Sequence, residues 1–210
     1  MGKVCVRGFA VSIDGFGAGQ DQSLDQPMGK GGGELHKWFY PTRAFRSMVG
    51  QEGGTEDRFA EWGMQGFGAF ILGRNMFGPA GDDWGGPEWE GWWGDNPPYH
   101  APTFILTHHA RAPIEMEGGT TFHFVTEGIA AALALAKAAA GDLDVKIGGG
   151  VSTVRQYLLA GAIDEIHLAQ SPVLLGRGEA LFEGIDLPAL GYRVTETVPT
   201  DLATHVVLTR

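Results

Sequence analysis

The chain has 210 residues, of which 43% are hydrophobic and 19% charged, so it can bury one sizeable core and is predicted to form one domain over residues 1–210. Its net charge of −10 argues against a nucleic-acid backbone or an anionic membrane as a partner. Cys5 is the only cysteine, which excludes an intrachain disulfide and a cysteine-based metal site, and we predict no metal. The first apolar run, residues 4–11, is too short for a secretion signal or a membrane span, so a cytoplasmic location is the default expectation.

Apolar runs separated by glycine-rich segments indicate strands and loops in the first half of the chain. Residues 4–11 are predicted to form a strand, and residues 12–19 a turn and a loop. Thr55 has the chemistry of a helix N-cap and precedes two acidic residues, so a helix is predicted over residues 55–64. The glycine-flanked run at residues 68–73 predicts a buried strand.

Strands and helices alternate in the second half. Thr126 is expected to cap an alanine-rich helix that ends at Ala140, with Gly141 as its C′ residue. Further strands are predicted over residues 103–107, 122–125 and 163–170, and a closing antiparallel pair over residues 192–198 and 203–209. The alternation predicts an α/β fold with a mostly parallel central sheet, flanking helices and antiparallel C-terminal strands.

The most informative stretch is a run of three glycines, Gly148, Gly149 and Gly150, between a β-branched segment and a helix-like segment. Glycine lets a ligand approach the main chain closely, and the first amides of a helix favour an anion. The helix-like segment runs from Val154 to Ala160. A phosphate cradle and an ordinary strand-to-helix turn both fit this pattern, and the residues alone leave the two open.

Two other predicted strands also end in residues that can bind a ligand. One is followed by Gly73, Arg74, Asn75 and Met76, and the other by Thr107, His108 and His109. Ligands of parallel sheets bind at the carboxyl ends of the strands. The three strand ends are therefore expected to form one site.

A tryptophan-rich insert occupies residues 78–98. Its aromatic side chains, with one tyrosine just beyond, are Trp84, Trp89, Trp92, Trp93 and Tyr99. They could stack on a planar heterocycle such as a pterin or a flavin, or they could pack the loop onto the body or onto a second subunit. The sequence favours packing and leaves stacking open.

Two flanking motifs complete a resemblance to a known family. The run Ser12-Ile13-Asp14-Gly15-Phe16 is similar to a Ser-Leu-Asp-Gly-Phe pattern, and residues 172–182 are similar to Pro-Val-Leu-Leu-Gly-x-Gly-x-x-Leu-Phe. With the three strand ends in this order, the chain resembles the dihydrofolate reductase-like superfamily. It is most similar to the C-terminal reductase domain of the riboflavin-biosynthesis deaminase/reductase, over nearly its whole length and without the zinc deaminase domain.

The resemblance implies NADPH as the cofactor. The pyrophosphate would be held by the main-chain amides of Gly148, Gly149, Gly150, Val151 and Ser152. The residues Gly73 to Met76 would line the cofactor, with the guanidinium of Arg74 on the 2′-phosphate. Thr107, His108 and His109 would lie near the adenosine ribose and its 2′-phosphate. Met76 departs from the family, because dihydrofolate reductase usually has a threonine there whose hydroxyl meets a phosphate.

The same resemblance implies that Ala10, Ser12, Ile13 and residues 15–17, among them Phe16, wall the nicotinamide site. The candidates for a proton donor are Asp14, Glu56, Asp57 and Glu61. Asp14 is the first of them, although a turn aspartate more often binds its own backbone. The implied substrate is a small planar heterocycle, either a pterin or an aminopyrimidine ribosyl derivative reduced at a ribosyl carbon. A homodimer is expected, with residues 172–182 at its interface. The alternative is a dimer of the same fold that binds a nucleotide or a flavin without turnover.

Overall fold

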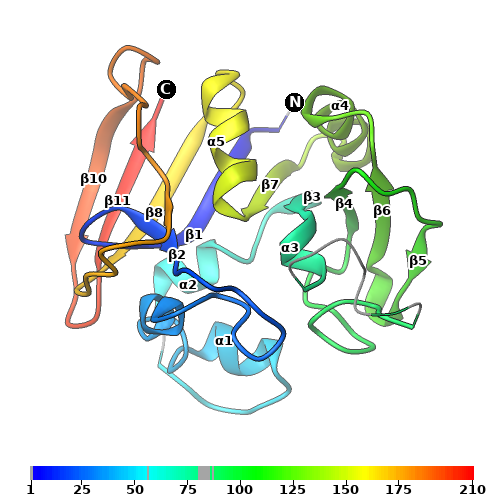
Figure 1. Cartoon of the computed structure of the whole chain (residues 1–210), viewed down its shortest axis with the longest axis horizontal. Coiled ribbons are helices and arrows are strands. Elements are labelled where there is room, and N and C mark those ends of the chain that lie inside the picture. Colours follow the sequence, from blue (N-terminus) through cyan, green and yellow to red (C-terminus); the bar gives the residue numbers. More distant parts are fainter. Residues whose placement is uncertain (1, 56, 80–85, 87) are drawn as a thin grey trace.

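A nine-stranded sheet runs through the middle of the computed structural model, which describes residues 2–55, 57–79, 86 and 88–210 (Figure 1). Its strand order is β10-β11-β8-β1-β7-β3-β4-β6-β5. The strands are β1 (Val4–Ser12), β3 (Phe67–Gly73), β4 (Pro102–Leu106), β5 (Ile114–Glu115), β6 (Thr121–Val125), β7 (Asp144–Gly149), β8 (Glu165–Ser171), β10 (Arg193–Pro199) and β11 (Thr204–Thr209). A second sheet pairs β2 (Phe16–Ala18) with β9 (Glu179–Ala180).

The six inner strands from β8 to β6 run parallel to their neighbours in this sheet. The C-terminal strands β10 and β11 pair antiparallel with each other, and β11 pairs antiparallel with β8. At the other edge, β5 pairs antiparallel with β6. The predicted fold class, a mostly parallel sheet with antiparallel C-terminal strands, is therefore confirmed.

Seven short helices connect the strands of the described residues. They are η1 (Gly32–His36), α1 (Arg43–Met48), α2 (Arg58–Trp62), α3 (Arg74–Phe77), η2 (Glu117–Gly119), α4 (Ile129–Ala140) and α5 (Val151–Leu159). None of the helices formed by these residues is long and apolar enough to span a bilayer.

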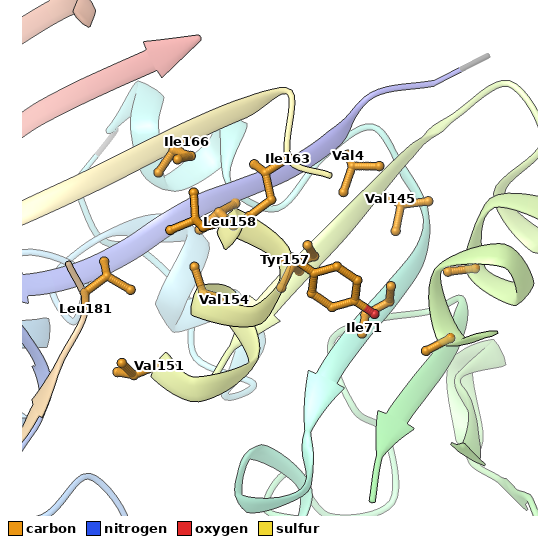
Figure 2. Packing of buried hydrophobic residues seen from close by; sticks show 14 of the residues in the cluster. Val4, Ile71, Val145, Val151, Val154, Tyr157, Leu158, Ile163, Ile166 and Leu181 are labelled. Atoms are coloured by element: carbon orange, nitrogen blue, oxygen red, sulfur yellow. The ribbon is translucent and has the colours of Figure 1, made fainter. Parts of the chain in front are cut away.

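Helices α4 and α5 pack on one face of the central strands. The alanines that α4 buries, Ala132, Ala136 and Ala140, are spaced four residues apart and lie on one stripe. Figure 2 shows side chains of the sheet facing those of α5, with the ring of Tyr157 among them. The Tyr157 hydroxyl donates a hydrogen bond of 2.8 Å to the Ile129 carbonyl and so ties α5 to α4.

Both predicted threonine caps are wrong. The N-cap of α2 is Asp57, whose carboxylate accepts hydrogen bonds from the amides of Phe59 and Ala60, while the Thr55 amide donates to the Pro41 carbonyl. Helix α4 begins after Gly128, at a φ of 87°. At α2, the charged carboxylate of Asp57 is the acceptor nearest the helix. At α4, no side chain of the described residues caps the start, and glycine readily adopts the positive φ found at Gly128.

Two predicted boundaries also move. Residues 12–19, expected as a turn and a loop, include strand β2, because the distant strand β9 offers it a partner. Helix α5 begins at Val151, three residues before the predicted Val154. The helix therefore starts directly after the glycine run, which brings its first amides into the turn itself.

Candidate functional site

The carboxyl ends of three adjacent parallel strands meet at one edge of the sheet. Strand β3 lies between β7 and β4 and is parallel to both. Gly149, Gly73 and Leu106 therefore end neighbouring strands at the same edge. The expectation that these three ends lie together is confirmed by the topology (Figure 1).

The turn after β7 requires its glycines. Gly149 has a φ of 128°, which only glycine adopts readily, and its peptide bond to Gly150 is cis. A Cβ atom on Gly148 would lie 2.5 Å from Cδ2 of Leu72 in β3. At Gly150, by contrast, a Cβ would meet no atom of the described chain within 4 Å. The main chain is therefore open to an approaching ligand at this last glycine.

The N terminus of α5 follows this turn without a capping side chain among the described residues. Gly150 is its N-cap, and its carbonyl accepts the first helical bond from Val154 at 3.1 Å. The amides of Val151, Ser152 and Thr153 are the first three of the helix, and Ser152 is exposed. Uncapped amides, together with the positive end of the helix dipole, can hold an anion.

Helix α5 begins directly against the end of β3. A Cβ atom on Gly73 would overlap Oγ1 of Thr153 and would lie 3.3 Å from the Gly150 nitrogen. The glycine in β3 is therefore what lets the helix N terminus lie beside the strand end. This contact brings two of the three predicted segments together.

The residues after Gly73 form α3. Arg74 Nη1 donates hydrogen bonds to the Pro79 carbonyl and, at 3.4 Å, to Oδ1 of Asn75. Met76 is half-buried, and its sulfur would lie 3.4 Å from a Cβ on Gly149. Met76 therefore presents an apolar surface to the glycine turn at the position where the resemblance expects a hydroxyl.

The residues after β4 form a tight turn. Thr107 Oγ1 accepts a hydrogen bond of 3.0 Å from the His109 amide, and the Thr107 amide donates to the Val125 carbonyl. His108 and His109 are exposed. The turn fixes its own backbone and leaves two imidazoles at the surface beside the strand end.

The segment after β1 places Ala10 in the core and Ile13 at the surface. Ala10 is 4% exposed, whereas Ile13 is 56% exposed. The Ser12 hydroxyl accepts a hydrogen bond of 2.9 Å from the Phe16 amide, which closes the loop, and Phe16 is half-buried in β2. Of these predicted nicotinamide contacts, the structure therefore places Ala10 in the central sheet, Ile13 on the loop and Phe16 in β2.

Phe9 is a residue of this site that the sequence did not indicate. A Cβ atom added to Gly149 would lie 3.6 Å from Cε2 of Phe9, and a Cβ atom added to Gly17 would lie 2.8 Å from Cε1 of Phe9. The ring of Phe9 therefore lies against the turn. A Cβ on Gly17 would also lie 2.7 Å from the Val151 side chain. Phe9 therefore packs at the meeting of β1, β2 and the glycine turn, and no local pattern signals this.

Asp14 holds a loop. Its carboxylate accepts hydrogen bonds from the amides of Leu175 at 3.1 Å and Gly176 at 2.7 Å. The Ser12 hydroxyl, followed by these amides, holds the pKa of Asp14 below its ordinary value. A carboxyl group that is ionised at neutral pH is poorly suited to donate a proton. These contacts favour a structural role, and the catalytic role of Asp14 stays a prediction.

Two shallow hollows flank the Asp14 loop, with volumes of about 360 and 430 Å³. They share Asp14, Gly15 and Phe182 in their walls. The larger also borders Leu168 and Gln170 of β8. Neither is lined by the glycines of the β7–α5 turn, so these hollows and the uncapped helix N terminus are separate features of the surface.

The described part of the tryptophan-rich insert packs on the body. Trp89 Nε1 donates a hydrogen bond of 2.8 Å to the Phe77 carbonyl, and its ring meets that of Trp92 at 4.7 Å. Tyr99 lies 5.1 Å from the ring of Phe70. Trp84 lies outside the described residues. Packing, one of the two interpretations of the insert, is therefore what Trp89 and Tyr99 do.

Across the described ranges, no group of three or more histidine, cysteine, aspartate or glutamate side chains could hold a metal ion. The mostly parallel sheet, with its antiparallel C-terminal strands and flanking helices, makes this an α/β protein. Within that class, the chain belongs to the family of the RibD C-terminal domain, whose model matches residues 4–206.

Solved structures of similar fold include three from bacteria. A putative riboflavin biosynthesis protein from Shewanella sp. PV-4 is 20% identical, aligns over 100% of this chain and 99% of its own, and has a TM-score of 0.56. RibD from Acinetobacter baumannii is 16% identical over 100% of this chain and 58% of its own, with a TM-score of 0.55. The diaminohydroxyphosphoribosylaminopyrimidine deaminase/5-amino-6-(5-phosphoribosylamino)uracil reductase of Thermotoga maritima is 15% identical over 99% and 56%, with a TM-score of 0.53.

The chain spans just over half the length of the last two proteins. At these identities the likeness shows the fold alone. No curated protein matched the sequence.

Proposed function

We propose that this protein is an NADPH-dependent reductase that transfers a hydride to a small planar heterocycle or to its ribosyl derivative. The observation that carries the proposal is the uncapped N terminus of α5, which follows Gly148, Gly149 and Gly150 and lies against the end of β3 at Gly73. Membership of the RibD C-terminal domain family supports it.

The residues at the strand ends fit such a cofactor. The amides of Gly150, Val151 and Ser152 would hold the pyrophosphate, because no side chain of the described residues caps them and the helix dipole favours an anion. Arg74, at the end of the neighbouring strand, carries the permanent positive charge that suits a 2′-phosphate. When bound, NADPH supplies the hydride.

The substrate would meet the cofactor near the loop that follows β1. Phe9 closes the sheet side of this region at the glycine turn, with Ile13 on the loop and Phe16 in β2. Ala10 pairs with Ala169 and is buried on the other face of the sheet. Apolar walls of this kind exclude water from a hydride transfer. The loop after Ser12 is held by its hydroxyl and by the contacts of Asp14, which gives the wall a fixed shape.

Two features favour a ribosylaminopyrimidine over a dihydropterin as the substrate. Of the carboxylates that are candidates for a proton donor, Asp57 caps α2 and Asp14 binds two amides, while Glu56 lies outside the described residues. The pKa of Asp14 is lowered by the Ser12 hydroxyl and by these amides, so this carboxyl group is ionised at neutral pH and is poorly suited to donate a proton. In addition, the structurally similar Thermotoga maritima protein is a deaminase and 5-amino-6-(5-phosphoribosylamino)uracil reductase.

Thermal unfolding with NADPH, with NADH and without ligand tests the proposal. A ligand that binds only the folded state at about 100 times its Kd stabilises it by about 2.7 kcal/mol. We expect a larger shift with NADPH than with NADH, and then loss of NADPH absorbance with a ribosylaminopyrimidine. No shift with either cofactor would contradict the proposal, whereas a shift without turnover on any pterin or pyrimidine would favour the non-catalytic alternative.

A further inference from the structure

Two histidines are buried together on the sheet face opposite α5. His167 in β8 and His205 in β11 are both 0% exposed. The ring of Phe59 stacks on both, at 4.6 and 4.3 Å between centroids, and Trp38 meets His205 edge-on at 5.0 Å. An unpaired buried polar group is costly, and three of the four ring nitrogens have a hydrogen-bond partner; Nε2 of His205 has none among the described residues.

A chain of hydrogen bonds fixes the tautomer of both rings. The Gly8 amide, which can only donate, lies 3.0 Å from Nδ1 of His167, so this nitrogen carries no hydrogen. The proton of neutral His167 is therefore on Nε2, from which it is donated to Nδ1 of His205 at 3.0 Å. His205 then carries its own proton on Nε2. The opposite arrangement would direct two N–H groups at each other between His167 and Gly8.

Gly8 is also where the pairing of β1 with β8 changes register. Val6 pairs with Ile166, but Phe9 pairs with Leu168, so Arg7 and Gly8 stand opposite the single residue His167. This is a β-bulge, and Gly8 supplies its positive φ of 73°. The hydrogen bond to His167 therefore holds the amide of the bulge itself.

The bulge decides which way the end of β1 faces. Side chains alternate along a strand, so one extra residue turns every later side chain to the opposite face. With the bulge, Phe9 lies opposite Leu168 and packs beside the core under α5, where it reaches the glycine turn. Without it, Phe9 would lie opposite Ala169 and would face the aromatic layer of Trp38.

We propose that His167, held in one tautomer by His205, is a positioning residue of the cofactor site: it fixes the bulge at Gly8 and thereby places Phe9 against the glycine turn. This inference rests on the proposed function, because the turn is taken as the place where NADPH binds. His167 acts through Gly8 and Phe9 and has no contact with the turn itself among those described.

The surroundings keep the pair neutral. Burial, the neighbouring His205 and the cations Lys146, Arg58 and Arg7 lower the pKa of His167 to about 3. Burial and Arg58 also lower the pKa of His205, against the opposing charge of Asp57. The tautomers are therefore expected to persist throughout the neutral and mildly acidic range.

The ¹⁵N spectrum of the imidazoles in the wild-type protein tests the tautomers without any ligand. We expect both rings to carry the proton on Nε2, and the signals of His167 to stay unchanged between about pH 5 and 8. Finding a proton on Nδ1 of His167 would overturn the inference on its own and would leave the proposed function untouched.

Two variants whose new side chains have nearly the same shape as each other test the link to the cofactor. His167→Asn keeps an acceptor oxygen at the place of Nδ1, whereas His167→Leu has a methyl group there. We expect the Leu variant to bind NADPH about tenfold more weakly than the wild type and the Asn variant to stay within about threefold. The Asn variant also buries an extra amide nitrogen, so its Tm should be no higher than that of the Leu variant.

If the substitutions acted only through a general loss of packing, the variant with the lower Tm would instead bind NADPH more weakly. Equal NADPH affinities for the Asn and Leu variants would overturn the positioning role. If the wild type itself does not bind NADPH, the proposed function fails and the cofactor part of this inference fails with it. The tautomer measurement distinguishes the two failures and still applies if a variant does not fold.

Discussion

The Oγ1 atom of Thr153, in the first turn of α5, lies where a Cβ atom on Gly73 would have to be placed. Thr153 is 5% exposed, so its side chain has little room to move aside. Helix α5 and the end of β3 can therefore be this close only if the strand ends in glycine. The contact fixes the distance between two of the three segments that form the candidate cofactor site.

Gly73→Ala should destabilise the protein by about 1–3 kcal/mol, because it overpacks a buried contact. Thr153→Ala removes the obstructing hydroxyl, so the double variant should recover part of that loss. Urea unfolding of the wild type, both single variants and the double variant gives the coupling energy between the two sites. Additive losses would show that the two side-chain positions do not compete for the same space.

Ser152→Asp should weaken NADPH binding while raising the Tm or leaving it unchanged. An acidic residue in the first turn of a helix complements the dipole, yet it repels a pyrophosphate held by the same amides. The control is Ser152→Asn, which has nearly the same shape and no charge. Calorimetric titration with NADPH should show the loss for Asp alone. Equal affinity of the two variants would place the pyrophosphate elsewhere.

Arg74→Ala should weaken NADPH binding and spare NADH binding. A charge-assisted hydrogen bond to the 2′-phosphate accounts for a loss of about 1–3 kcal/mol. Dissociation constants for both cofactors measure the difference, and Arg74→Lys shows how much of it depends on the planar fork of donors. An equal loss for both cofactors would mean that Arg74 holds the local structure, for instance through the Pro79 carbonyl.

The free energy of unfolding should fall in acid because of His167. Its pKa is about 3 in the folded chain, against an ordinary value of 6.5. Between these pH values the unfolded chain binds a proton that the folded chain does not, so stability decreases as the pH falls, by about 1.4 kcal/mol per unit. Above pH 6.5 the contribution is constant.

Urea titrations of the wild type and His167→Asn at pH 7, 6 and 5 isolate this contribution, because the other titrating groups are common to both proteins. The variant should lose stability less steeply with falling pH. Identical pH dependence in the two proteins would show that His167 gains its proton in the folded chain as easily as in the unfolded one.

Asp14→Ala should loosen the loop that contains Leu175 and Gly176, since both amides lose their acceptor. Faster hydrogen exchange at these two amides is the expected result, with exchange in α4 unchanged as the internal control. Folding favours the ionised form of this carboxyl group. Its contribution to the free energy of unfolding is therefore present above its ordinary pKa and is lost as the pH falls through its lowered pKa. Unchanged exchange at these amides would contradict the structural role and would favour the prediction that Asp14 is a proton donor.

Local sequence patterns predicted most elements because their causes lie within a few residues. Strand β3 is an apolar run that ends in Gly73, and β10 and β11 were both expected as an antiparallel pair. The errors fell where two nearby residues compete for one role. Asp57 caps α2 in place of Thr55, and Gly128 precedes α4 in place of Thr126.

The sequence by itself determined that a glycine turn, an arginine-bearing strand end and a histidine-bearing strand end exist, because glycine, charge and hydroxyl chemistry are local properties. Only the tertiary structure decided that β7, β3 and β4 are neighbours and that Thr153 meets Gly73. It alone showed the bulge at Gly8 and its contact with His167, 159 residues away. The register of a strand depends on its partner, and that partner is chosen by packing across the whole sheet.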